Sequence, residues 1–179
     1  MAVSAEGKFQ YPTGKNGALA LNYDQIIVEN SPAELLASFC SVGNPFSIDA
    51  IPPGSQVLDI GCGGGFDMIV AGRLVGEKGR VCGIDLTEEM VNRARKNMEL
   101  ANIRNFELHH VDTDNIPYPD QTFDVAISNG VINLSPRKKQ LFTEIRRVLK
   151  PGGRLQFADI ILKKELPDSL AASPEAWSQ

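Results

Sequence analysis

Hydrophobic positions along the chain alternate between short continuous runs and longer stripes with helical spacing. From residue 55 onward, five short apolar runs predict strands at residues 57–60, 81–84, 106–111, 123–128 and 155–161. Between them, apolar residues recur every three or four positions and predict helices near residues 69–74, 87–101 and 141–149. Strands that alternate with helices on this scale form βαβ units. The pattern therefore predicts an α/β fold with a mostly parallel, doubly wound sheet and helices on both faces.

The first part of the chain lacks this pattern. Residues 1–30 are rich in glycine, lysine, asparagine and serine, and we expect a flexible N-terminal arm there. Ser31, Pro32 and Glu34 then predict a helix start, with Ser31 as the cap, Pro32 in the first turn and Glu34 reaching back. The expected organisation is an arm at residues 1–30 followed by a single domain at residues 31–179.

Composition narrows the class of protein. A chain of 179 residues with 42% hydrophobic and 22% charged residues is long enough to fold without disulfides or a metal. The three cysteines have no metal-ligand spacing, which favours a reduced, cytoplasmic setting and no metal site. No apolar run approaches the ~20 residues that span a bilayer, and residues 1–10 contain no secretory signal. We therefore expect no membrane association.

Charge argues against nucleic acid as a partner. The net charge is −4, which is unfavourable for binding phosphate backbones. Residues 137–154 are locally basic, with Glu144 as their one acid, and this segment could in principle contact RNA. A solvated helix face explains it better, because cations are favoured near a helix C-terminus in any case. From the sequence we therefore expect no nucleic-acid partner.

A glycine-rich segment carries the chemistry. Asp59, Gly61, Gly63 and Gly65 follow one another at every second position where the first strand ends and a helix begins. Glycines at such a turn allow a ligand to approach the backbone closely. The dinucleotide pattern would require glycine at Phe66, and no Lys-Ser/Thr pair follows, so a nucleotide P-loop is excluded. An acid beside the loop favours a ligand with a cationic head.

This spacing resembles the first motif of class I S-adenosylmethionine (SAM) methyltransferases, and the resemblance covers residues 55 to about 165. Segments 111–117, 123–129 and 148–153 resemble later motifs of the same family, in the same order. The resemblance implies a Rossmann-like fold that binds SAM and releases S-adenosylhomocysteine (SAH). It also implies a set of cofactor-binding residues: Asp59, Gly61, Cys62, Gly63, Gly65, Asp85, Leu86, Asp112, Thr113 and Asn129.

The same resemblance implies roles for some of these residues. Asp85 would bind both ribose hydroxyls, since a carboxylate can accept two hydrogen bonds at once. Asp112 would accept from the adenine amino group, with the Thr113 amide against the ring, although Asp114 is a nearby competitor. Asp59 would either face the SAM ammonium or orient the glycine loop.

A narrower resemblance points to the arsenite methyltransferases. Residues 75–79 and 128–136 resemble segments of that family, as does the stretch at 165–167 followed by Trp177. Those enzymes hold arsenic(III) between cysteine thiolates, because soft arsenic prefers soft sulfur. One of these cysteines falls at Gly130 here, and Cys40 is a candidate for another. Glycine cannot coordinate arsenic, which counts against arsenite as the acceptor.

The expected function is SAM-dependent methyl transfer to a small-molecule acceptor, and the sequence identifies no catalytic residue. The alternative is a non-catalytic SAM- or SAH-binding module, or a fragment of a larger methyltransferase. Sheets of the family end in a hairpin after the fifth strand, but residues 166–168 and 173–174 break up the remaining chain and no strand pair is evident. We therefore expect either a piece of a longer protein or a homodimer that covers the exposed fifth-strand edge.

Overall fold

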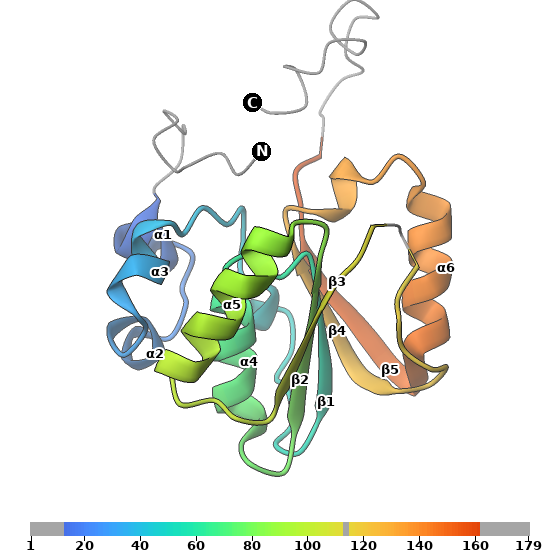
Figure 1. Ribbon diagram of the computed structural model, residues 1–179, viewed down its shortest axis with the longest axis horizontal. Helices are drawn as coiled ribbons and strands as arrows, with labels where there is room; N and C mark the ends of the chain where they lie inside the picture. The colour runs from blue at the N-terminus through green and yellow to red at the C-terminus, as the bar shows by residue number, and fades with distance from the viewer. Residues whose placement is uncertain (1–12, 113–114, 162–179) are drawn as a thin grey trace, which may run out of the picture.

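Five strands pair into one parallel sheet in the order β3-β2-β1-β4-β5 (Figure 1). The computed structural model describes residues 13–112 and 115–161. The strands are β1 (Gln56–Ile60), β2 (Arg80–Asp85), β3 (Phe106–His110), β4 (Phe123–Asn129) and β5 (Leu149–Ala158). The predicted α/β fold is confirmed, and the strand order reverses between β1 and β4. In open parallel sheets, ligands bind beyond the carboxyl ends of the strands at this reversal.

Helices cover both faces of the sheet, as the doubly wound pattern predicts (Figure 1). On one face, α4 (Phe66–Val75) and α5 (Glu88–Leu100) pack against side chains such as Val57, Val81 and Val125. On the other face, α6 (Lys138–Val148) packs against alternate residues of the same strands, such as Leu58. The central strands are therefore buried on both sides, which explains why their sequences form continuous apolar runs.

The chain passes from α6 into β5 without the break that Pro151, Gly152 and Gly153 suggested. β5 begins at Leu149 instead of residue 155, and its pairing with β4 is irregular between Phe123 and Val125. Gly152 has φ +80°, a conformation that glycine adopts at little cost. An irregularity of this kind accommodates proline at the edge of a sheet.

Residues 13–30 do not form the flexible arm expected from the sequence. They contain α1 (Gly14–Ala20) and α2 (Gln25–Glu29), and α3 (Ala33–Ala37) follows. Ala18, Tyr23 and Val28 are buried in the core on the α4 side of the sheet. The buried positions are too few and too irregularly spaced to give a helical signal, so only tertiary packing reveals them. Residues 1–12 lie outside the described part of the chain.

The predicted cap of the following helix also differs. Pro32 is the N-cap of α3, and Ser31 donates its hydroxyl hydrogen to the carbonyl of Ile27 at 2.8 Å. Ser31 thus donates a hydrogen bond to a carbonyl of α2 and does not cap the start of α3.

In the described sheet, β5 is an edge strand. Residues 13–112 and 115–161 contain no strand beyond it, and the tail in which no final hairpin was expected lies largely outside the described residues. Across the same residues, we find no helix with the length and apolar character needed to cross a membrane.

Candidate cofactor site

The carboxyl ends of β1, β2 and β4 meet around a cavity of about 290 Å³. Its lining comes from the end of β1 and the glycine loop, the end of β2 and the two residues after it, the residue after β3, the segment between β4 and α6, and one residue of α6. The lining residues are Ile60, Gly61, Ile84, Asp85, Leu86, Thr87, Val111, Val131, Leu134, Ser135, Pro136 and Leu141. The cavity is largely apolar with a few polar groups, as small-molecule sites usually are.

Two glycines of the loop serve different physical needs. Gly61 has φ +72°, and a Cβ there would lie 2.5 Å from the methyl groups of Val131, so this position admits only glycine without rearrangement. Gly63 has φ +50°, and a Cβ there would meet nothing within 4 Å. Gly61 therefore lets the loop pack against the segment after β4, whereas Gly63 leaves open space in front of the backbone. Gly65 ends the loop as the N-cap of α4.

Asp85 links the second strand to this loop. One carboxylate oxygen accepts from the Gly63 amide at 2.8 Å, and the other accepts from the Thr87 amide at 2.9 Å. A carboxylate oxygen can accept about two hydrogen bonds, so each oxygen keeps room for a ligand donor. Leu86, the next residue, is 65% exposed and lines the same cavity. Asp85 is thus both anchored and able to bind a diol.

Asp59 is buried behind the loop, with 2% of its surface exposed, and its Oδ2 has no hydrogen-bond partner. Burial raises the pKa of this carboxyl group, and the nearby Asp67 and Asp85 raise it further. A buried acceptor without a partner is costly, and a donor or a positive charge would relieve that cost. A cation bound in front of the loop would lower the cost of ionising Asp59 from behind it.

Asp67 belongs to this cluster, although the sequence did not single it out. Its side chain is buried in the first turn of α4, where one oxygen accepts from the Tyr23 hydroxyl at 2.7 Å and the other from the Asn129 amide at 3.0 Å. Burial raises its pKa to about 6, although the hydrogen bonds from Asn129 and Tyr23 oppose that shift. In sequence, an acid in a first helical turn is typical of an exposed position. The one sequence signal that could have identified Asp67 is its position two residues after the last glycine of the loop.

Four predicted cofactor residues are less directly placed. Cys62 belongs to the loop, and its side chain is buried against β2, where the sulfur lies 3.0 Å from the position of a Cβ on Gly83. Only the backbone of Cys62 is therefore available to a ligand. Asp112 is exposed and follows Val111, which lines the cavity. Thr113 lies outside the described residues. The side-chain oxygen of Asn129 accepts from the amides of residues 42 and 43, so this amide group contacts protein.

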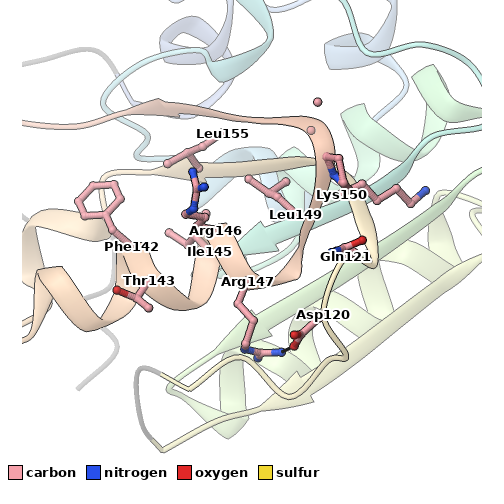
Figure 2. A pocket seen from close by; sticks show the side chains of 13 residues that line it. Asp120, Gln121, Phe142, Thr143, Ile145, Arg146, Arg147, Leu149, Lys150 and Leu155 are labelled. Carbon is pink, nitrogen blue, oxygen red and sulfur yellow. Dashed lines mark hydrogen bonds and ion pairs between the residues drawn. The ribbon is translucent and has the colours of Figure 1, made fainter.

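A larger hollow of about 770 Å³ lies elsewhere, between α6 and the first residues of β5 (Figure 2). Phe142, Leu149 and Leu155 contribute to its walls. It opens near the amino ends of β4 and β5 and is lined by none of the predicted cofactor residues. In this fold the amino ends of the strands do not carry the ligand site, so the smaller cavity is the candidate.

A parallel sheet in this order, with an acid-flanked glycine loop after β1 and an acid at the end of β2, defines the class I SAM-dependent methyltransferase domain. A family profile described as a methyltransferase domain matches residues 51–179. The chain belongs to this methyltransferase family, and SAM is the cofactor of the class.

Curated relatives agree with this assignment. An arsenite methyltransferase from Halobacterium salinarum is 37% identical over 164 residues, which cover 92% of this chain and 42% of the relative. A demethylmenaquinone methyltransferase from Listeria monocytogenes is 37% identical over 110 residues, covering 61% of this chain and 46% of the relative. The chain therefore spans less than half the length of these relatives.

Solved structures share the fold. A SAM-dependent methyltransferase from Aquifex aeolicus matches with a TM-score of 0.62 and 30% identity, covering 70% of each chain. An arsenic(III) SAM methyltransferase from Chlamydomonas reinhardtii matches with a TM-score of 0.67 and 35% identity, covering 92% of this chain and 55% of that one.

Proposed function

We propose that the chain binds SAM at the glycine loop and transfers its methyl group to a small-molecule acceptor. The observation that carries the proposal is the link between Asp85 and the Gly63 amide, which holds an acid with spare acceptor capacity beside an open loop. Asp59 supports it further, because its Oδ2 lacks a partner and suits the ammonium group of SAM. The residues present therefore fit this cofactor.

The proposed contacts follow from these positions. Asp85 binds the ribose hydroxyls, Leu86 covers the adenosine, and Asp112 with Thr113 binds the adenine edge. The backbone of the loop approaches the amino-acid part of SAM, and the residues in this group are Gly61, Cys62, Gly63 and Gly65, with Asp59 behind them. Asn129 contributes by holding the end of β4 in place. When bound, SAM supplies a methyl group already activated by its sulfonium. The chain's task is to align the acceptor, and such positioning can supply most of the acceleration.

The acceptor is proposed to be a soft or already ionised small molecule. Cys62 and Cys82 are buried, and Cys40 is the exposed cysteine of the described residues. No group of three or more histidine, cysteine or acidic side chains in this part of the chain could hold a metal ion. The described residues therefore offer no thiol cage for arsenite. Among the described residues around the site we find no general base, which an already ionised nucleophile does not need.

Calorimetric titration with SAM and SAH tests the cofactor site. We predict that Asp85→Ala weakens SAM roughly 10- to 150-fold, because it removes charge-assisted hydrogen bonds that contribute about 1.5–3 kcal/mol. Glu77→Ala is the control, since Glu77 is exposed beyond the far end of α4. Unchanged affinity in Asp85→Ala would contradict the assignment.

A methyl-transfer screen then tests the activity. Labelled SAM is supplied with a panel of acceptors that includes arsenite with added thiol. Transfer to any acceptor supports the enzyme. A protein that binds SAH tightly and methylates nothing in the panel would instead be the non-catalytic binding module.

A further inference from the structure

A buried hydrogen-bond network joins three segments that are far apart in sequence. Tyr23 follows α1, Asp67 lies in the first turn of α4, and Asn129 ends β4. The Asn129 amide nitrogen lies 3.0 Å from both Asp67 Oδ2 and the Tyr23 hydroxyl oxygen, and that hydroxyl donates to Asp67 Oδ1 at 2.7 Å. The glycine loop runs directly into α4, so this network sits immediately behind the proposed cofactor site.

Asn129 uses the rest of its amide group to hold the backbone of a fourth segment. Its oxygen accepts from the Val42 and Gly43 amides at 3.2 and 3.3 Å, and its nitrogen donates to the Gly43 carbonyl at 2.9 Å. The Val42 side chain in turn lies over Gly130, where a Cβ would be 3.3 Å from both Val42 methyl groups. The end of β4 and the N-terminal segment are thereby fixed against each other.

Asp67 helps to fix which way the Asn129 amide group faces. An ionised carboxylate only accepts hydrogen bonds, so it requires the amide nitrogen on its side. The amide oxygen must then face Val42 and Gly43, which both donate. In the flipped orientation, an oxygen would face the carboxylate and an NH₂ group would face two N–H donors. The carboxylate on one side and the two N–H donors on the other therefore specify the same orientation of this amide group.

The electrostatic surroundings of Asp67 make this buried acid costly for folding stability, so a role in packing alone does not explain it. Asp59, Asp85 and Tyr23 are the titratable groups that act on this cluster, and no cation pairs with Asp67 among the described residues. Burial opposes ionisation of Asp67, whereas its two hydrogen bonds favour it. A group of this kind at the mouth of a binding loop is typical of a functional site.

We propose that Asp67 is a positioning residue of the cofactor site. It orients Asn129, and through Asn129 it holds residues 42–43 and the end of β4 beside the glycine loop. This inference rests on the proposed function for its ligand. Without Asp67, the segments that flank the cofactor would be ordered only on binding, and that ordering cost would appear as lost affinity.

A double-mutant cycle on SAH binding tests the inference. Asp67→Ala, Asn129→Ala and the double variant are titrated with SAH well below their melting temperatures. We expect each single variant to bind roughly 10-fold more weakly, and the double variant to bind within about 2-fold of the weaker single one. Independent, multiplying losses would overturn the proposal, because Asp67 would then not act through Asn129.

Asp67→Asn provides the rescue. The new amide can offer its oxygen to Asn129 and its NH₂ group to the Tyr23 oxygen, while the Tyr23 hydroxyl hydrogen turns to the Gly43 carbonyl at 3.1 Å. The hydrogen bonds are kept and the charge is lost, so we expect SAH affinity within about 3-fold of the wild type. Affinity as low as that of Asp67→Ala would show that the charge itself binds the ligand and would overturn a positioning role.

Hydrogen exchange on the ligand-free protein separates this inference from the proposed function. The Val42 and Gly43 amides are expected to lose protection in Asp67→Ala and to keep it in Asp67→Asn. Asp124→Asn is the control, because Asp124 joins Gln56 and Lys150 at the opposite end of the strands. A wild type that binds no SAH would refute the proposed function, yet exchange would still decide the positioning role. Unchanged protection in Asp67→Ala would refute that role.

Discussion

Two buried carboxylates lie next to the glycine loop, and their surroundings differ. Asp59 has an oxygen without any partner, whereas both oxygens of Asp67 accept hydrogen bonds. Burial raises the pKa of each group. A protein that keeps two such acids side by side loses stability at neutral pH. A cationic ligand would recover part of that loss, since opposite charge favours ionisation.

Because folding raises the pKa of Asp67, this group makes the free energy of unfolding depend on pH. In the unfolded chain the group ionises near its ordinary value of 3.8, and in the folded protein near 6. The stabilisation present below pH 4 is therefore lost as pH rises towards 6, by about 3 kcal/mol. We predict that Asp67→Asn gains stability over the wild type between pH 4 and 7. Denaturant unfolding at several pH values measures the difference.

Asp124→Asn should show the opposite trend. Burial acts against ionisation of Asp124, but the Gln56 amide and Lys150 together lower its pKa. Its contribution is lost as pH falls, so this variant should differ least from the wild type at low pH. For the preceding prediction, the contradicting result is an Asp67→Asn variant whose free energy of unfolding depends on pH as in the wild type.

At the scale of elements, the glycine loop combines packing with access. We predict that Gly61→Ala lowers the free energy of unfolding by about 2–4 kcal/mol, since its new methyl group overlaps Val131 at a positive φ. Gly63→Ala meets open space and should cost only about 1 kcal/mol of backbone strain. Gly63→Ala should nevertheless weaken SAH binding, because its methyl group occupies the space in front of the loop. Denaturant unfolding and calorimetry of both variants check this; equal stability losses would contradict it.

Arg147 ties α6 to the loop before β4 (Figure 2). Its guanidinium donates to the carbonyls of Ile116 and Tyr118 at 2.8 Å each and pairs with Asp120 and Glu144. Arg147, one of the basic residues between positions 137 and 154, thus has a structural role.

Loss of this side chain leaves two carbonyls without their donor. We predict that Arg147→Ala lowers the free energy of unfolding by about 1–3 kcal/mol, measured by denaturant titration. Arg146→Ala is the matched control, because Arg146 is exposed on the same helix and should change stability by less than about 0.5 kcal/mol. A similar small effect in both variants would refute the role of Arg147.

At the scale of the whole molecule, β5 exposes the edge of the described sheet. Phe157 of β5 and Phe142 of α6 are 40% and 41% exposed, with ring centroids 6.3 Å apart. An open edge with apolar neighbours favours pairing with a second copy. We predict a homodimer through β5, with a mass near twice 19.5 kDa in sedimentation equilibrium. Phe157→Asp should shift the protein towards the monomer, and a monomeric wild type would contradict the prediction.

The sequence by itself determined the parts of this protein that depend on local pattern. Continuous apolar runs indicated where the five strands lie, because a strand buried on both faces has few polar positions. The glycine spacing after Asp59 and the acid at Asp85 located the loop, because both lie at strand ends, and their resemblance to a methyltransferase motif indicated SAM as the ligand.

Only the tertiary structure decided what depends on contacts between distant residues. Tyr23 meets Asp67 across 44 positions and Asn129 across 106, and such pairs leave no periodic signal. For the same reason residues 13–30 lacked a helical pattern, although Tyr23 is buried against Phe39 and Phe66. Local sequence specifies elements through propensity and periodicity. The hydrogen-bond network behind the cofactor loop arises only when the sheet brings the ends of its strands together.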